Sequence, residues 1–369
     1  MSVTRSTRTP LRRVAAGLLA LGVVVALSAC GSGGDADGDS GAAADVNKTW
    51  TSVDEMVAAA KKESGPLNVY IAPEYAPFVQ PGFEKAYPWA KLNVTQLEPV
   101  PSVAKWSAEL SSGFSQADVV FMHSTGVQTF KDLKALAQVT VPNDANVEPA
   151  LQDKDHYSHP VTELGEVMLY NTKLISTPPK TVAELADPEW KGKVIMDSPQ
   201  LGGAGGFVLA SERSAMGDAA WQTWLQKVAD NDLYVTDTSS ASYAAVVRGD
   251  RPVCICNYGD YISQAPGTPV GVDFYGQDDR GIVVEPIVGT ISKTAPHPAL
   301  AALFMNWMLA ADGGQQGFVD SGRVPTVPVP GADKVSLPEG TKVMNLYEDL
   351  GDYISDPDSA NTVFKKIFK

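Results

Sequence analysis

The segment GIVVEPIVG, at residues 281–289, decides the fold of this chain, because it is the second of two long extended runs. The first is GEVMLYN, at 165–171, and strand patterns alternate with helical patterns before it and between the two runs. No further set of strand–helix pairs follows residue 289, so the second run returns the chain to the first region. We therefore expect an α/β fold of two doubly wound domains, joined by two crossover strands, with a ligand cleft between them.

Three strand patterns precede the first crossover. A helical pattern with a capping box at Ser52 and Glu55 comes before the first of them, and the second and third each lead into a helical pattern. Strands that alternate with amphipathic helices indicate a mostly parallel sheet. One of the helical patterns covers 123–138, where Val127, Phe130, Leu133 and Leu136 recur at helical spacing. The strand patterns are LNVYIA (67–72), KLNVTQLE (91–98) and ADVVFM (117–122).

The same alternation continues between the crossovers, with strand patterns at KVIMD (193–197), LYVTD (233–237) and VCICN (253–257). The chain of 369 residues is also longer than a single hydrophobic core usually supports. We expect domain I to comprise 49–163 plus 286–369, and domain II, with the crossover strands, to comprise 164–285.

The first 29 residues have the pattern of a secretory signal, with arginines but no acidic residue and then an apolar run from Val14 to Leu27. Leu27-Ser28-Ala29-Cys30 resembles a bacterial lipobox, which implies cleavage before Cys30 and a lipid on its sulfur. Residues 30–48 begin with a Gly-, Asp-, Ser- and Ala-rich stretch that is typical of a flexible tether. We expect a lipoprotein, held by Cys30 at the extracytoplasmic face of the cell membrane.

The chain is acidic, with 43 Asp and Glu residues, 29 Lys and Arg residues and a formal net charge of −14. Affinity for nucleic acid comes mostly from Lys and Arg on phosphates, so this charge argues against a nucleic-acid partner. The sequence has no GxSxG elbow, no P-loop and no dinucleotide fingerprint, which argues against an enzyme and a cofactor. We expect a monomer without a cofactor.

Two cysteines besides Cys30, Cys254 and Cys256, lie in RPVCICNY. At positions i and i+2 of a strand they point to the same face. A disulfide between such close neighbours is expected to be strained, and no CxxC partner or nearby histidine completes a metal site. We favour two buried thiols.

The following segments occur in this order along the chain: KKESGPLNVY, FEKAYP, ADVVF, LYNTKLISTPPKTVAELADPEWKGKV, AVVRGD, ISKTAPHPALAALFMNWMLAADGGQQGF and SGRVPT. Together they resemble the extracellular solute-binding proteins of ABC importers, in the branch that includes iron(III), thiamine, phosphonate and polyamine binders. The resemblance runs from about Trp50 to Thr326 and is most specific around Trp190 and at the HP of residues 297–298.

This resemblance implies a type II periplasmic-binding-protein fold, which closes on one small solute by a hinge motion and delivers the solute to a membrane permease. A lipid anchor would hold such a protein near its permease. A solute sensor that passes a ligand signal to a membrane partner would have the same features, so sensing is the alternative to transport.

Ligands of open α/β sheets bind beyond the carboxyl ends of the strands, and these ends can be located in the sequence. Three helix starts there are rich in Ser, Thr and Gly, and would offer amides and hydroxyls to an anion, although N-capping is their alternative role. The candidate ligand-binding residues are Glu74, Tyr75, Ser124, Thr125, Gly203, Gly205, Ser239, Ser240, Tyr258 and Tyr261.

Among solutes we rank an organic anion first, either a phosphonate or a carboxylate, then a cation like a polyamine or thiamine, and then iron(III). Iron-binding relatives use two adjacent tyrosines as ligands, whereas Tyr258 and Tyr261 are three positions apart. Only if the solute is iron would His123 and Glu74 join these tyrosines as ligands. Otherwise we expect no metal site.

Overall fold

Residues 46–149, 151–199, 204–275, 280–344 and 357–368 are described by the computed structural model of the chain. From Ala43 onward the chain forms one compact unit. None of the helices in the described ranges combines the length and the apolar character that a bilayer crossing requires.

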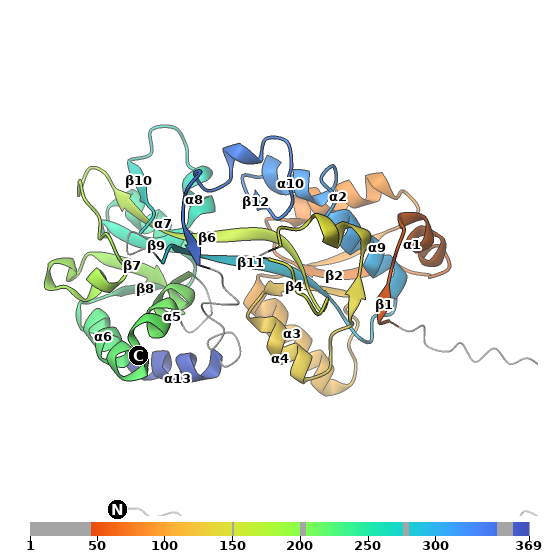
Figure 1. Ribbon diagram of the computed structural model, residues 1–369, viewed down its shortest axis with the longest axis horizontal. Helices are drawn as coiled ribbons and strands as arrows, with labels where there is room; N and C mark the ends of the chain where they lie inside the picture. Colours follow the sequence, from red (N-terminus) through yellow and green to blue (C-terminus); the bar gives the residue numbers. More distant parts are fainter. Residues whose placement is uncertain (1–45, 150, 200–203, 276–279, 345–356, 369) are drawn as a thin grey trace, which may run out of the picture. The chain divides into compact units, whose positions relative to one another are not determined.

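One mixed sheet runs through this unit (Figure 1). Its main strands are β2 (Leu67–Ile71), β3 (Leu92–Gln96), β4 (Val119–His123), β6 (His159–Asn171), β7 (Val194–Asp197), β8 (Tyr234–Thr236), β9 (Val253–Asn257) and β11 (Ile282–Ile291). They follow the order β3-β2-β4-β11-β6-β9-β7-β8. We call the part built on β2, β3 and β4 the first lobe, and the part built on β7, β8 and β9 the second lobe.

Strands within each lobe are parallel, whereas the two strands between the lobes are antiparallel to each other and to their outer neighbours. β6 and β11 lie side by side, so they connect the lobes as the two predicted crossovers (Figure 1). Every predicted strand is present. The predicted α/β fold with two crossover strands is therefore confirmed.

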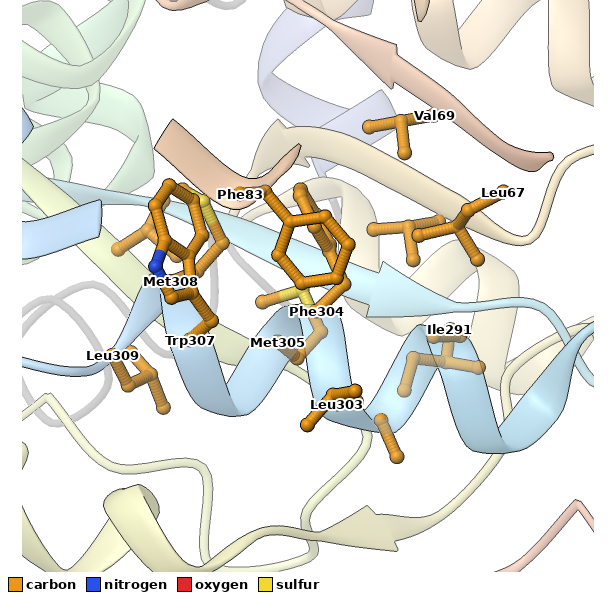
Figure 2. Close-up of a cluster of buried hydrophobic side chains, with 14 of the residues drawn as sticks. Leu67, Val69, Phe83, Ile291, Leu303, Phe304, Met305, Trp307, Met308 and Leu309 are labelled. Atoms are coloured by element: carbon orange, nitrogen blue, oxygen red, sulfur yellow. The ribbon is translucent and has the colours of Figure 1, made fainter. Parts of the chain in front are cut away.

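The core of the first lobe packs α9 (Pro298–Met308) against the sheet and α2 (Ala76–Ala86), as Figure 2 shows. Phe83 of α2 lies 5.2 Å from Phe304 and 5.5 Å from Trp307 between ring centroids. α9 is apolar on nearly all sides, as expected for a helix enclosed by protein. The other helices of this lobe are α1 (Val53–Ala60), α3 (Pro99–Ser112), α4 (Gly126–Asp132) and α10 (Gly314–Asp320).

The start of α9 is held by a buried carboxylate. Pro298 occupies the first turn, where its missing N–H costs nothing. The amide of His297 donates to Asp118 Oδ1 (2.7 Å), and its Nδ1 lies 3.0 Å from Asp118 Oδ2. His297 Nε2 also lies 2.8 Å from the carbonyl oxygen of Ser64. These contacts tie α9 to the sheet and to the segment after α1.

The second lobe has its own hydrophobic cluster, which includes residues of both crossovers. Its helices are α5 (Ala204–Met216), α6 (Asp218–Asp230), α7 (Ser239–Arg248), α8 (Tyr258–Ile262) and α13 (Pro357–Ile367). The sequence predicts that all of 286–369 belongs to domain I. Ala360 and Phe364 of α13 are instead fully buried in the cluster of the second lobe, and the Phe364 ring lies 5.8 Å from Trp221. The other predicted boundaries stay predictions.

Short elements complete the fold. β1 pairs with β5, β10 and β12 pair with β6, and β13 pairs with β11. Their bounds are β1 (Lys48–Thr49), β5 (Val139–Thr140), β10 (Val270–Asp273), β12 (Val324–Pro325) and β13 (Val343–Met344), with 3-10 turns at Pro142–Asn146, Ala183–Ala186, Pro188–Trp190 and Ala332–Lys334.

Two sequence predictions were wrong in detail. The helix predicted over 123–138 ends at Asp132, because Lys134 adopts a left-handed conformation (φ 56°) that breaks the helix. Cys254 and Cys256 are buried as predicted, but they form a disulfide rather than two thiols. Their Cα atoms are 5.7 Å apart, which is within the span of a disulfide, and the strand directs both side chains to one face.

Candidate functional site

Residues at the carboxyl ends of strands in both lobes meet across β6 and β11. The His123 ring, at the end of β4, lies 6.1 Å between centroids from Phe207 of α5 in the second lobe. Arg323, next to β12, acts electrostatically on Asp260 of α8. We call this meeting point the junction and define it by Glu74, Glu98, His123, Glu166, Asp197, Asp260, Glu285 and Arg323.

At the start of α7, serine hydroxyls already bind a carboxylate of the protein, that of Asp260. Ser239 Oγ donates to Asp260 Oδ2 (2.8 Å), and Ser240 Oγ donates to Asp260 Oδ1 (2.9 Å). The amide of Asn257 in turn donates to Ser239 Oγ (2.8 Å). Burial raises the pKa of Asp260, and the two serine hydroxyls oppose that rise. The predicted serines therefore position a carboxylate.

The start of α5 repeats this arrangement with a second carboxylate. The amide of Gly205 donates to Asp197 Oδ1 (2.6 Å), and a Cβ at position 205 would come within 2.6 Å of the Asp197 carbonyl oxygen. Glycine is thus required for the close approach. Burial raises the pKa of Asp197 to about 6, against the Gly205 hydrogen bond that lowers it. Gly203, the other predicted glycine, lies outside the described residues.

The third predicted helix start, in the first lobe, is unlike the other two. Ser124 is 1% exposed, and its hydroxyl has no hydrogen-bond partner among the described residues. Its amide donates to the carbonyl oxygen of Pro286 on β11 (3.2 Å). Thr125 is the N-cap residue of α4 but makes no side-chain capping bond. Ser124 therefore brings a buried polar group to the crossover strand.

Glu74 and Tyr75 both lie next to Arg323, the arginine of the junction. The guanidinium of Arg323 lies 5.1 Å from the Tyr75 ring centroid, and its Nη2 is 3.7 Å from Glu74 Oε1. Tyr75 is 3% exposed and packs edge-on against Phe318, 5.1 Å away between centroids. Burial raises the pKa of its phenol, so Tyr75 remains a neutral phenol that packs against its neighbours and is not a phenolate ligand.

Tyr258 and Tyr261 form a stacked aromatic pair, in which Tyr258 is buried in the hydrophobic cluster of the second lobe and Tyr261 is partly buried against it. Their rings stack with centroids 6.0 Å apart and planes 18° apart. Burial raises the pKa of Tyr258, with Tyr261 contributing in the same direction, which disfavours the phenolate that would bind iron. The other two iron candidates have different partners: His123 Nδ1 lies 2.9 Å from Glu285 Oε1, and Glu74 faces Arg323. The four iron candidates are thus not assembled into one ligand set.

Each crossover strand adds a buried carboxylate to the junction. Glu166 of β6 is 1% exposed and Glu285 of β11 is 0% exposed. Among the described residues, Glu166 Oε2 and Glu285 Oε2 have no hydrogen-bond partner. Burial raises the pKa of Glu285 to about 7, with His123 lowering it and Asp197 raising it. Burial also raises the pKa of Glu166 well above its ordinary value.

Sequence reasoning missed most of the charged residues of the junction. It identified Glu74, but not Glu98, Glu166, Asp197, Glu285 or Arg323 as site residues, and it passed over Asp260 between the two tyrosines. A signal was available for two of them, because Glu166 and Glu285 are the acidic residues inside GEVMLYN and GIVVEPIVG. A carboxylate in a buried strand needs a partner or a function.

The fold and the junction define the chain as a two-lobe binding protein, with polar groups from both lobes and both connecting strands gathered in one place. Comparison with known proteins is more specific. Residues 82–336 match the family of bacterial extracellular solute-binding proteins, so the chain belongs to that family. Membership makes it a solute-binding protein rather than an enzyme, in agreement with the sequence analysis.

The chain is similar to the thiamine-binding periplasmic protein of Salmonella typhimurium, with 28% identity over 142 residues, 38% of this chain and 43% of that protein. The matched stretch thus spans less than half the length of that relative. It is also similar to iron uptake protein A2 of Synechocystis, with 25% identity over 265 residues, 67% of this chain and 75% of that protein.

Two solved structures share the fold. Iron-bound HitA from Pseudomonas aeruginosa has a TM-score of 0.72 at 19% identity, covering 82% of this chain and 99% of that chain. A periplasmic thiamin binding protein has a TM-score of 0.70 at 18% identity, covering 83% and 97%. These likenesses confirm the type II binding fold that the resemblance implied.

Proposed function

We propose that the protein captures a small cationic solute between its lobes and delivers it to the permease of an ABC importer. The charge of the junction carries this proposal. Six carboxylates, from Glu74, Glu98, Glu166, Asp197, Asp260 and Glu285, meet there with only Arg323 and His123 as the basic residues that define it. Glu166, Asp197 and Glu285 are buried, Asp260 is half-buried, and Glu74 and Glu98 are exposed. A cationic group would offset the cost of burying the first three, whereas an anion would add to it.

This ranking reverses the one made from the sequence, where an organic anion came first. The anion hypothesis depended on free amides and hydroxyls at helix starts. At α7 the two hydroxyls already donate to Asp260, and at α5 the Gly205 amide already donates to Asp197. An anion at either place would face a carboxylate at hydrogen-bonding range.

An organic cation fits the junction better than iron does. The partly buried ring of Tyr261, stacked on Tyr258, would provide an aromatic face for a planar or aliphatic cation. The described residues bring no group of three His, Cys, Asp or Glu side chains into an arrangement for a metal ion. A thiamine-like cation or a polyamine is the class of solute that we infer, and the thiamine-binding relatives are consistent with it.

A thermal-melt screen of the purified chain tests the solute class. The panel would contain thiamine, spermidine and putrescine as cations, and phosphonates, citrate and ferric citrate for the other classes. A ligand at 100 times its dissociation constant stabilises the folded state by about 2.7 kcal/mol, which shifts the melting midpoint measurably. We expect shifts with cations only. A shift with phosphonates or citrate and none with cations would overturn the proposed class.

The lipid anchor and the transport role need separate tests. Cys30 lies outside the described residues, so the anchor is supported by the lipobox pattern alone. Cys30→Ser should release the protein from the membrane fraction, and retention there would contradict the anchor. Deletion of the gene should abolish uptake of the solute identified in the screen. Unchanged uptake together with a lost response to that solute would favour the sensor alternative.

A further inference from the structure

The two carboxylates on the crossover strands share one face of the sheet. β6 and β11 are antiparallel, with Leu164 opposite Glu285 and Gly165 opposite Val284. Glu166 is therefore the diagonal neighbour of Glu285 on that face, and such neighbours lie roughly 7–8 Å apart between Cα atoms. At this spacing, one positively charged group between the two carboxylates could contact both of them.

Several groups face these two carboxylates from the surrounding elements. Asp197 at the end of β7 and Asp260 of α8 both raise the pKa of Glu166, as does Glu285, whereas Asn257 of β9 lowers it. Tyr275 also interacts electrostatically with Glu166. Glu285 faces His123 of β4 and Asp197. His123 is the one basic group in this set.

The polar groups here are not satisfied by the described part of the protein. Glu166 Oε2, Glu285 Oε2 and the hydroxyl of Ser124 are buried without a hydrogen-bond partner among the described residues. Glu285 Oε1 has His123 Nδ1 at 2.9 Å, but its Oε2 and that of Glu166 have no such partner in the described part of the chain. A buried, ionised carboxylate that is incompletely paired favours the binding of a proton or a cation. The raised pKa values of Glu166 and Glu285 agree with protons in the ligand-free protein.

We propose that the cationic group of the solute binds between Glu166 and Glu285, one carboxylate from each crossover strand, and displaces protons from them. This inference rests on the proposed function. We call the position between Glu166 and Glu285 the floor site of the junction. Since β6 and β11 connect the lobes, a cation that bridges them also favours the hinge geometry in which both carboxylates face it.

Isothermal titration of the wild-type chain with thiamine and spermidine tests the proton displacement without any variant. Titrations at one pH in buffers of different ionisation enthalpy count the protons released on binding. We expect proton release at pH 7 and an affinity that rises as the pH increases from 6 to 8. The rise should approach tenfold per pH unit for each proton released, at pH values below the pKa of the group. Binding without proton release would overturn the proposal.

Substitution then assigns the site. Glu166→Gln should weaken cation binding at least tenfold and reduce the number of protons released. Glu163→Gln is the matched control, because Glu163 is also a carboxylate of β6 whose pKa is raised to about 7 by burial, but its neighbouring acid is Glu148. The control should bind like the wild type. Equal loss in both variants, or none in Glu166→Gln, would refute the assignment.

The proposed site between Glu166 and Glu285 and the proposed function can be refuted separately. A wild-type protein that binds a cation while Glu166→Gln binds it equally well contradicts only the floor site. A wild-type protein that binds an anion and no cation contradicts the proposed function, and the floor site with it.

Discussion

Replacement of Glu285 by Gln should change the pH dependence of folding, because Glu285 is fully buried and its pKa is raised from 4.5 to about 7. Below pH 4.5 the carboxyl is protonated in both the folded and the unfolded state and contributes nothing. As the pH rises towards 7, the unfolded state loses the proton first, so the folded state loses stability. Each unit of pKa shift corresponds to about 1.4 kcal/mol, which amounts to about 3 kcal/mol above pH 7.

His123 contributes in the same direction. With Glu285 beside it, the pKa of His123 lies above its ordinary value, although burial alone would lower it. In the variant that partner is gone, so burial dominates and protonation of His123 is disfavoured in the folded state at low pH. Glu285→Gln is thus expected to lose stability relative to wild type at pH 5 and to gain at pH 8.

Urea unfolding of both proteins without ligand, at pH 5, 6, 7 and 8, measures this difference. The free energy of unfolding of the variant minus that of the wild type should increase by about 3 kcal/mol across the range. A difference that does not change with pH would refute the reasoning, since it would mean that burial does not raise the pKa of Glu285.

Other predictions concern the parts that hold the junction in place. Phe83→Ala should lower the free energy of unfolding by about 3–5 kcal/mol, because the fully buried ring leaves a cavity beside Phe304 and Trp307; an exposed site such as Phe114, replaced in the same way, should cost far less in urea unfolding. Asp118→Ala should cost about 3–5 kcal/mol in the same measurement, since it leaves the buried amide and ring of His297 without their carboxylate. Alkylation of the denatured, unreduced protein should leave Cys254 and Cys256 unmodified, and two added labels by mass spectrometry would contradict the disulfide. Ser239→Ala with Ser240→Ala should weaken cation binding by loosening Asp260, whereas Ser263→Ala, whose hydroxyl donates to the Gly259 carbonyl oxygen, should not.

The fold could be predicted because most of its inner strands are buried apolar runs, which stand out in the sequence, whereas β3 and β8 at the sheet edges are only partly buried. The run from Ile282 to Ile291 is buried throughout, and the helix after Pro298 is bounded by a proline start that is visible in the sequence. The end of α4 could not be predicted. Leu136 continues the helical spacing in the sequence. In the structure it forms an isolated antiparallel bridge with Ser292 and is buried there, so its apolar side chain does not indicate a helix.

The candidate site stays a prediction, and the structure changes the charge that we assign to it. Ser239, Ser240 and Gly205 lie at helix starts as expected, and their hydrogen-bonding groups point to an anion as expected. That anion is a side chain of the protein, from Asp260 or Asp197. The sequence shows that these hydroxyls and this amide can donate hydrogen bonds. The packing of α8 and β7 determines that their acceptors are Asp260 and Asp197.

The account depends most directly on the charge of the solute, and Asp260→Asn tests it. A full charge at about 5 Å from a cation is worth about 3 kcal/mol at an effective dielectric constant near 20, or roughly a hundredfold in affinity. Asp250→Asn removes the same charge from an exposed pair with Arg248 in the same lobe and serves as the control. Isothermal titration with the cation that gives the largest shift in the thermal screen should show a loss of about a hundredfold for Asp260→Asn and almost none for Asp250→Asn. Equal affinity in both variants, or tighter binding of an anion by Asp260→Asn than of any cation by the wild type, would contradict the account.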